Sequence, residues 1–443
     1  MRDNNGEATR PGGIRRPSTV RIINDIDQPG RREFLRAVAI GGVAATAGGA
    51  ILPTPGLASP SSSAPVIAPG KTATAFVRDF ADPYLELIRL LREATEVEHA
   101  LMLQYLYAAF SLRPEYEDVR GQGDPNTTDF IGVAVQEMQH LGLVNRLLVE
   151  LGANPNMMPQ DLPYEPDIYP FEFALEPISQ QSLAKYVYCE APAGAFDPAK
   201  AKTPEDKLFL ARMNRALGPI KRPNHVGSFY DVVIDTLGQV EALAASGIAL
   251  PHTIDFKRWR KALIDLKDEG EVGHYVFFKD VFMGTHKGFK DRKNVWDLPP
   301  SDAHYPGVNV PRNPTAYVGH KGHISDPNAL NLAWLGNLHY WTVLSLLTHA
   351  YTHDAPKLVD QAKMHMMGPL ASLARHLPTM GAAITFDQLS MGYSMGTDPA
   401  CSRFMFTRLL GETIAMEKRL EGKLPADYAL TVAADTMAEI LNT

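Results

Sequence analysis

Hydrophobic and polar positions follow helical spacing over most of the chain after residue 82. In each such segment, apolar residues recur every three or four positions, which is typical of an amphipathic helix with one buried face. The expected helices span residues 83–112, 128–151, 180–190, 226–245, 255–282, 329–351, 355–377 and 401–420, with a short one near the C-terminus. This pattern predicts an all-α fold.

Charged residues interrupt the apolar stripes of three of these helices. Glu98 lies on the stripe of helix 83–112, and Glu137 and His140 lie on that of helix 128–151. Helix 255–282 repeats the second arrangement with Glu271 and His274. A Glu and a His three positions apart share one helix face and can hold one metal ion. A buried carboxylate is costly unless it is paired or bound to metal, so these positions indicate a metal site.

The spacing of these residues matches a bundle with two metal ions. Glu98 precedes Glu137 by 39 residues, and Asp231 precedes Glu271 by 40. In ferritin-like bundles, two helices each give a Glu-x-x-His pair and the other two each give a carboxylate. We therefore predict a ferritin-like four-helix bundle followed by a smaller helical region. The expected metal ligands are Glu98, Glu137, His140, Asp231, Glu271 and His274, with Glu190 as an additional candidate.

Each candidate also has a structural interpretation that the sequence leaves open. Glu137 and His140 could form a buried hydrogen bond within their helix, and Asp231 could be solvated. Glu190, which precedes Ala191-Pro192, could cap helix 180–190 instead of binding metal, and Glu269 is an alternative ligand to Glu271. Glycines at 270 and 273 each weaken a helix by about 1 kcal/mol relative to Ala, which indicates close packing or a local bulge there.

Composition and charge narrow the range of partners. The 443 residues carry a formal net charge of −7. Residues 1–58 have a net charge of +3, so the remainder carries −10, which argues against nucleic acid or an anionic membrane as the main partner. Two cysteines, Cys189 and Cys401, allow at most one bridge and no disulfide framework.

The N-terminal region has the layout of an export signal. Arg31-Arg32 precede Phe34-Leu35, an uncharged run follows at 37–52, and small residues end it at 56–58. A basic region, a short apolar core and small residues are typical of a cleavable signal, and the arginine pair resembles a twin-arginine signal. The alternative is a disordered tail. We expect export of the folded protein by the twin-arginine machinery to the periplasm or the extracellular space, with no integral membrane span in the mature form.

The expected organisation has five parts. Residues 1–58 hold a disordered start and the signal, and residues 59–74 are a linker. Residues 75–285 form the ferritin-like bundle, residues 286–328 are an irregular connector, and residues 329–443 form a C-terminal helical domain.

Several motifs resemble the iminophenyl-pyruvate dimer synthase family, which includes enzymes of violacein and rebeccamycin biosynthesis. The most specific are Glu98-His99-Ala100-Leu101-Met102 and Glu137-Met138-Gln139-His140-Leu141. Similar motifs start at Tyr186, Gly227 and His274, so the resemblance covers most of the chain after the signal. Ser228 stands where family members usually have Glu, which leaves Asp231, one turn later, as a candidate substitute.

These observations lead to three functional hypotheses. The first is an oxidase or oxygenase with two iron ions, or manganese, that uses dioxygen or peroxide on a small organic substrate. The second, implied by the resemblance, is a haem-binding enzyme of oxidative coupling. The run 364–367 around His365 could offer haem ligands, although core methionines explain this run more simply. The third is a metal-binding or structural protein without catalysis. The sequence assigns no catalytic residue, substrate or oligomeric state.

Overall fold

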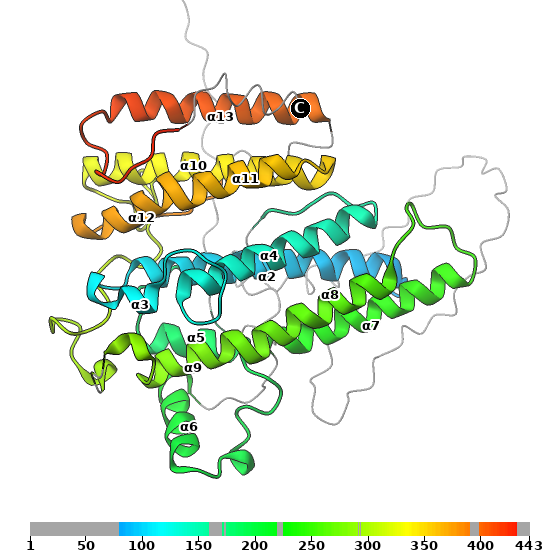
Figure 1. Cartoon of the computed structure of the whole chain (residues 1–443), viewed down its shortest axis with the longest axis horizontal. Helices are drawn as coiled ribbons and strands as arrows, with labels where there is room; N and C mark the ends of the chain where they lie inside the picture. Colours follow the sequence, from blue (N-terminus) through cyan, green and yellow to red (C-terminus); the bar gives the residue numbers. More distant parts are fainter. Residues whose placement is uncertain are drawn as a thin grey trace, which may run out of the picture. The chain divides into compact units, whose positions relative to one another are not determined.

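The computed structural model describes residues 79–158, 171, 174–218, 225–290, 292, 294–389 and 398–431 (Figure 1). All of them belong to one compact unit, Pro60–Thr443. These residues form helices and loops without a β-strand, so the all-α fold class is confirmed. The expected signal, the linker and the last short helix lie outside the described residues.

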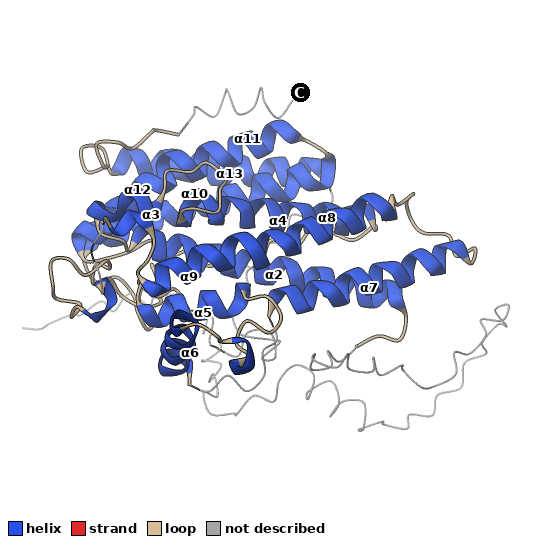
Figure 2. Ribbon diagram, turned by 60° about the horizontal axis from the view of Figure 1, so that its bottom comes forward, coloured by secondary structure: helices blue, strands red, loops and turns tan. Residues whose placement is uncertain are grey.

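Four long helices form the bundle that holds the candidate site. They are α2 (Pro83–Phe110), α4 (Phe130–Glu150), α7 (Val226–Ala245) and a continuous fourth helix (Figures 1 and 2). α2 packs most extensively on α4 and also on α7, while α7 packs on the fourth helix. Asp82 and Asp129 cap α2 and α4, because their carboxylates accept backbone N–H bonds in the first turn.

The fourth bundle helix changes its winding halfway along. It runs as α8 (Phe256–Asp268), the π-helical segment η3 (Glu269–His274) and α9 (Tyr275–Met283). A Cβ atom on Gly273 would lie 2.4 Å from Cγ2 of Thr127, so no larger residue fits without a shift. The bulge and the close packing predicted from Gly270 and Gly273 are therefore confirmed.

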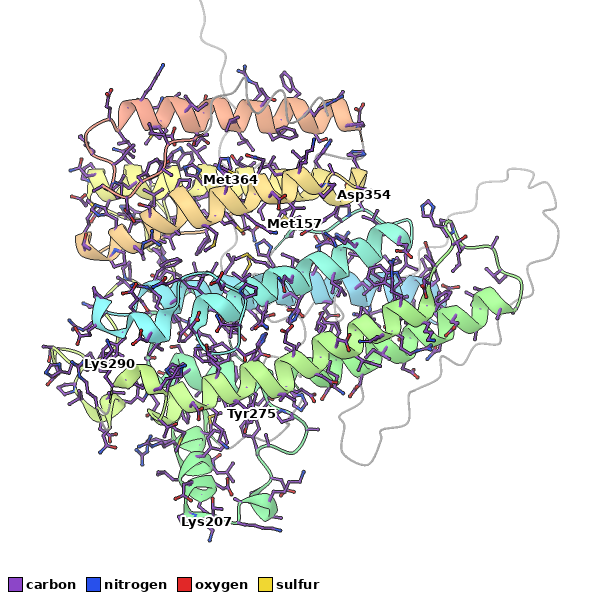
Figure 3. All side chains as sticks on the ribbon, viewed as in Figure 1. Met157, Lys207, Tyr275, Lys290, Asp354 and Met364 are labelled. Carbon is purple, nitrogen blue, oxygen red and sulfur yellow. The ribbon has the colours of Figure 1, made fainter. Side chains whose placement is uncertain are left out.

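Helix α5 (Gln180–Glu190) lies beside the bundle and packs on α9. We expected it to be the single helix between residues 153 and 223, which is wrong, because α6 (Pro204–Leu217) packs on α5. Figure 3 shows Lys207 on this extra helix. α6 buries only Phe209 and Met213 and is stabilised at its start by a capping box, so it lacks the wide apolar stripe that identifies most helices.

The C-terminal helices pack on one side of the bundle. They are α10 (Pro327–His353), α11 (Pro356–His365), the π-helical segment η6 (Met366–Leu370), α12 (Ala371–His376) and α13 (Pro399–Arg419). α10 contacts α11, α13 and α4. The helix expected at 355–377 is interrupted at Pro369, which lacks a backbone N–H. None of the described helices is both long and apolar enough to cross a membrane.

Short elements and loops complete the described residues. The remaining turns are η1 (Pro114–Tyr116), α3 (Glu117–Arg120), η2 (Pro198–Lys200), η4 (Lys287–Phe289), η5 (Val295–Asp297) and η7 (Leu377–Met380). The segment between α9 and α10 contains no longer helix among its described residues.

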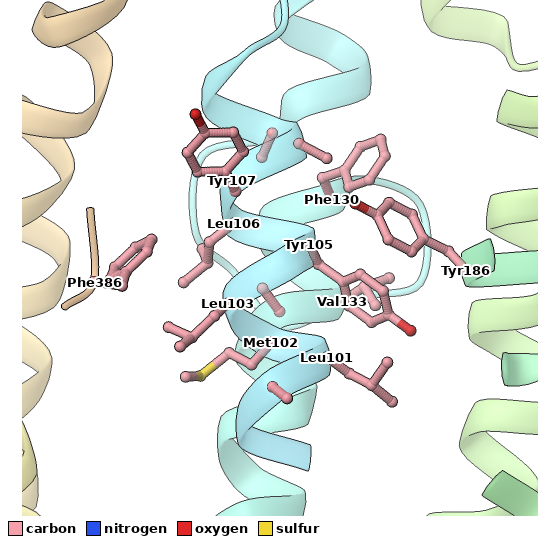
Figure 4. Packing of buried hydrophobic residues seen from close by; sticks show 14 of the residues in the cluster. Leu101, Met102, Leu103, Tyr105, Leu106, Tyr107, Phe130, Val133, Tyr186 and Phe386 are labelled. Atoms are coloured by element: carbon pink, nitrogen blue, oxygen red, sulfur yellow. The ribbon is translucent and has the colours of Figure 1, made fainter. Parts of the chain in front are cut away.

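An aromatic cluster fills the bundle between α2, α4, α5 and α9. The Tyr105 ring lies 4.9 Å from that of Tyr186 and 4.6 Å from that of Phe278, and Phe130 lies 5.5 Å from Phe278. In Figure 4, Leu101 and Tyr105 point towards the Tyr186 side of α2, whereas Met102, Leu103 and Leu106 point towards Phe386. The two faces of α2 thus meet different neighbours. Pairs of aromatic rings at these separations contribute roughly 0.5–1.5 kcal/mol each beyond the area they bury.

Candidate metal centre

Five carboxylate and imidazole side chains, which are of the kinds that can ligate metals, meet inside the bundle, and none exposes more than 5% of its surface. Glu98 comes from α2, Glu137 and His140 from α4, Glu190 from the last position of α5, and His274 from the last position of η3. Burial of three carboxylates together is costly unless positive charge compensates them.

The five side chains form two groups that share Glu137. In one group, Nδ1 of His140 lies 3.0 Å from Oε2 of Glu137 and 3.7 Å from Oε2 of Glu98. In the other, Nδ1 of His274 lies 3.0 Å from Oε1 of Glu137 and 3.6 Å from Oε2 of Glu190. Within each group the donor atoms lie within 4.8 Å of one another, so each could hold one ion. Because each oxygen of Glu137 faces a different group, this carboxylate is in the position of a bridging ligand.

The structure does not bring Asp231 into this cluster. Its side chain is exposed on α7, and Oδ1 accepts a hydrogen bond from Nζ of Lys267 at 2.6 Å. The α7 residues that line the cavity at the cluster are Val226, Gly227 and Tyr230. The carboxylate expected from the third bundle helix is therefore replaced in space by Glu190 from α5.

Glu271 lines the same cavity but belongs to neither group. In an α-helix, Glu271 and His274 would share one face, but η3 is wound with i→i+5 hydrogen bonds, which shifts residues three apart onto different faces. Glu269 instead reaches the cluster, with Oε2 at 2.9 Å from Nε2 of His140. The residue noted as the alternative to Glu271 thus makes the closer contact.

Hydrogen bonds from neighbouring residues hold the ligating groups in place. Nε2 of His274 lies 3.2 Å from Oε1 of Gln136, and the Gln136 amide donates to Glu269. The Tyr230 hydroxyl donates to Oε1 of Glu98, and the Tyr105 hydroxyl donates to Oε1 of Glu190. Each imidazole therefore points Nδ1 at the carboxylates while its Nε2 is held by another side chain, an arrangement that orients ligands in metal sites.

Burial and mutual charge shift the pKa values of the whole cluster. Burial and the neighbouring Glu137 raise the pKa of Glu98 to about 8, and the same two causes raise the pKa of Glu190. Burial opposes ionisation of Glu137 as well, but His274 and His140 hold its pKa well below its usual range. Burial disfavours charge on His274, yet Glu137 and Glu190 raise its pKa to about 10. Without metal, the cluster therefore retains protons that a cation would displace.

The donor set fits a pair of metal ions. Nδ1 of His274 is fully buried and has no hydrogen-bond partner in acceptable geometry, although two carboxylates lie nearby. A cation among these oxygens would use that lone pair and neutralise the carboxylates. Mixed carboxylate and imidazole donors suit iron or manganese. The residues present thus fit the group that the bundle implies.

The residues considered above for a disulfide bridge and for haem ligation lie outside the metal cluster or are not its ligands, and the structure gives the surroundings of each. Cys189 is buried and Cys401 is exposed, and both are free thiols. Nδ1 of His365 lies 3.0 Å from Nδ1 of His339, so one of them donates to the other. Met364 is 53% exposed and Met367 is 40% exposed, and therefore neither is a core methionine.

Sequence comparisons agree with the ferritin-like bundle and with the family resemblance of the motifs. Residues 91–256 match the sequence model of the ferritin-like family. The chain is 27% identical over 383 residues to dichlorochromopyrrolate synthase of Lentzea aerocolonigenes, covering 68% of this chain. It is 36% identical over 147 residues to 2-imino-3-(indol-3-yl)propanoate dimerase of Chromobacterium violaceum, covering 27% of this chain. The resemblance predicted from the motifs is confirmed.

The chain spans only part of the length of these relatives. The matched region covers 36% of the synthase and 14% of the dimerase. No solved structure matches the chain.

Proposed function

We propose that the cluster around Glu137 binds two iron or manganese ions and that the protein is an oxidoreductase. A small organic substrate would lose two electrons and two protons, which reduce dioxygen to peroxide or peroxide to two waters. This proposal rests on the geometry of Glu137. One of its carboxylate oxygens faces His140 and the other faces His274, so the two candidate ion positions share this residue. The bound metals would supply the one-electron redox chemistry.

The chain's own residues would position the ions and limit access to them. Gln136 and Glu269 fix the imidazole rings, so Nδ1 of each His remains directed at the carboxylates. The cavity at the cluster has a volume of about 20 Å³, which holds roughly one water-sized molecule. A cavity of this size has no room for an aromatic ring. The organic substrate would therefore react from outside, next to the partly exposed lining residues Lys267, Gly270 and Glu271.

Metal analysis of designed variants tests this function. We expect two ions per chain in the wild type, at most one in Glu98→Gln, and none in Glu137→Gln, because only the latter removes a ligand from both groups. Asp231→Asn is the matched control, since its carboxylate is exposed and pairs with Lys267. Equal metal content in all four proteins would contradict the proposed site. Metal content that is lost while oxygen consumption stays unchanged would contradict the proposed reaction.

A second candidate function is the coupling of two aromatic imino acids, which the names of the relatives favour. The imine derived from tryptophan can be generated by an amino-acid oxidase and offered to the metal-loaded protein, with the products followed by mass spectrometry. A coupled product that Glu137→Gln does not form would support this function. A Soret band in the purified active protein would instead favour the haem hypothesis, and full metal occupancy without oxygen consumption would favour a non-catalytic role.

We also propose that the chain is exported in folded form, which rests on the Arg31-Arg32 pair and the apolar run after it. Folding before export would allow the metals to be loaded inside the cell. Cell fractionation of the wild type and of a variant with both arginines replaced by lysine tests this. Export that is unaffected by the replacement would contradict the twin-arginine route.

A further inference from the structure

A second, larger cavity lies on the other face of the α2/α4 pair. Its volume is about 200 Å³, and it shares no lining residue with the cavity at the metal cluster. Consecutive residues separate the two: Glu98 and Glu137 line the metal cavity, while His99 and Met138 line the second one. Figure 3 shows Met157, another lining residue, between α4 and the C-terminal helices. We call this cavity the interhelix slot.

The slot is elongated along α2. Its lining residues on α2 begin at His99 and end at Phe110, at spacings that follow one helix face. The eleven helical rises from the first to the last of these residues span about 16 Å, which gives the approximate length of the slot. An apolar cavity of about 150 Å³ already accommodates benzene, so a volume of 200 Å³ admits a larger apolar body.

The wall of the slot is apolar and adaptable. Five of its lining residues are methionines, namely Met102, Met138, Met157, Met366 and Met367. Unbranched thioether side chains adjust to ligands of different shape, and surfaces rich in methionine are typical of adaptable apolar binding. Leu103, Leu106 and Phe386 add a continuous hydrocarbon surface. A water-filled slot of this character would be unfavourable, and an apolar ligand would remove that cost.

Two guanidinium groups line one end of the slot. Arg120 exposes only 14% of its side chain, and the closest carboxylate oxygen among the described residues belongs to Glu117, at 3.7 Å. Arg375 lines the same end and pairs with Asp427 at 2.9 Å. Burial and the nearby Arg375 lower the pKa of Arg120, despite Glu117. The end of the slot therefore carries positive charge that is only partly compensated and would favour an anion.

The opposite end holds a buried polar atom. His99 is fully buried, and its Nε2 lies 2.9 Å from the Tyr340 hydroxyl. Its Nδ1 has no hydrogen-bond partner in acceptable geometry, although the Met157 backbone is near enough to influence its pKa. An unsatisfied buried group costs about 1–3 kcal/mol, so a water molecule beside Nδ1, beyond the end of an apolar ligand, would be favoured.

We propose that the interhelix slot is a binding site for an elongated alkyl carboxylate, with its carboxylate at Arg120 and Arg375 and its chain between the methionines. The slot length and its apolar wall fit an extended chain, and the two arginines at one end fit a single negative charge. This site is independent of the metal cluster, because the two cavities are lined by different residues.

Calorimetric titration of the metal-loaded protein with dodecanoate tests the proposal. We expect binding of one dodecanoate per chain, and at least fivefold weaker binding in Arg120→Gln and Arg375→Gln, because each loses a charge-assisted contact. Arg375→Lys should recover part of the affinity. Arg408→Gln, an exposed change on α13, should bind like the wild type. Dodecanol should bind equally to the wild type and to the glutamine variants.

Two further variants test the location of the ligand. Leu106→Trp fills the middle of the slot and Met367→Trp fills its partly exposed side, so both should abolish binding of dodecanoate and dodecanol. Unchanged circular dichroism and metal content would show that each variant is folded. If Leu106→Trp does not fold, Met367→Trp alone provides the test. Dodecanoate binding that survives Met367→Trp and both arginine changes would overturn the site. Tighter binding of 3-phenylpropanoate than of any alkyl carboxylate would overturn the assignment of the ligand.

Discussion

At the scale of single residues, replacement of Tyr230 tests how hydrogen bonding supports the proposed metal ligands. Its hydroxyl donates to Oε1 of Glu98 and leaves Oε2 towards His140. We expect Tyr230→Phe to lower metal affinity by about 10- to 100-fold, because ligands that lose an orienting partner bind metal less well. Manganese titration followed by electron paramagnetic resonance measures this. Tyr186→Phe removes another buried hydroxyl, which donates to the Gln104 carbonyl, and should leave the affinity unchanged. Equal losses in both variants would contradict a specific role for Tyr230.

The same scale shows why part of the site could be predicted from the sequence. Glu98, Glu137 and His140 lie on apolar stripes, so helical spacing alone brings them inside the bundle. Asp231 lies beside its stripe, and spacing could not decide between solvent and cluster. Glu190 reaches the cluster because α5 packs across α9, which is a contact between elements that no local pattern records.

At the scale of secondary-structure elements, replacement of Gly273 tests the packing of the π-helical segment. A Cβ atom there would lie 2.4 Å from Cγ2 of Thr127. We expect Gly273→Ala to destabilise the fold by about 1–3 kcal/mol, although Ala favours helices over Gly by about 1 kcal/mol. Urea unfolding measures the change. Adding Thr127→Ser removes Cγ2 and should recover at least half of the loss. A stabilising effect of Gly273→Ala alone would show that helix propensity outweighs the contact.

Elements also differ in how well their sequence predicts them. The glycines at 270 and 273 indicated a bulge, but its winding, which turns Glu269 rather than Glu271 towards His140, depends on the packing around it. α6 was missed because it buries two residues and is stabilised mainly by its capping box, which is a weaker signal than a wide apolar stripe.

At the scale of the whole molecule, the metal site connects α2, α4, α5 and the fourth bundle helix. Metal binding to the folded state should raise the stability of the unit by about 2.7 kcal/mol at a hundredfold excess over the dissociation constant. We expect the thermal midpoint to rise with added manganese in the wild type and in Asp231→Asn. Glu137→Gln should show no rise, and chelation should reverse the rise in the other two proteins. A rise in Glu137→Gln equal to that of the wild type would place the responsible ion elsewhere.

The packing of the C-terminal helices on the bundle is the feature that the sequence predicted least. The hydrogen bond between His99 and Tyr340 joins residues 241 positions apart. Helical spacing identifies the two helices but contains no information about which of their faces meet. The interhelix slot arises from that meeting, and for this reason it had no counterpart in the sequence pattern.

Histidines in these C-terminal helices should make the stability of the molecule depend on pH. Burial lowers the pKa of His365 to about 4, and burial together with His365 holds the pKa of His339 well below its usual range. Both are therefore neutral when folded and gain protons on unfolding below pH 6.5. Their contribution is complete above pH 6.5 and is lost as the pH falls towards 4, at roughly 1.4 kcal/mol per pH unit for each histidine.

Urea unfolding at pH 7, 6 and 5 measures this dependence in the wild type and in two variants. His365→Gln has no proton to gain at this position, so we expect its stability to fall between pH 6 and 5 by about 1 kcal/mol less than that of the wild type. Gln can still hydrogen-bond His339, which limits the loss of stability at pH 7. His320→Gln replaces an exposed histidine and should follow the wild-type curve. The metal cluster is unchanged in all three proteins, so its own titration cancels in the comparison. Parallel curves for the wild type and His365→Gln would mean that the buried pair does not control the acid sensitivity of the fold.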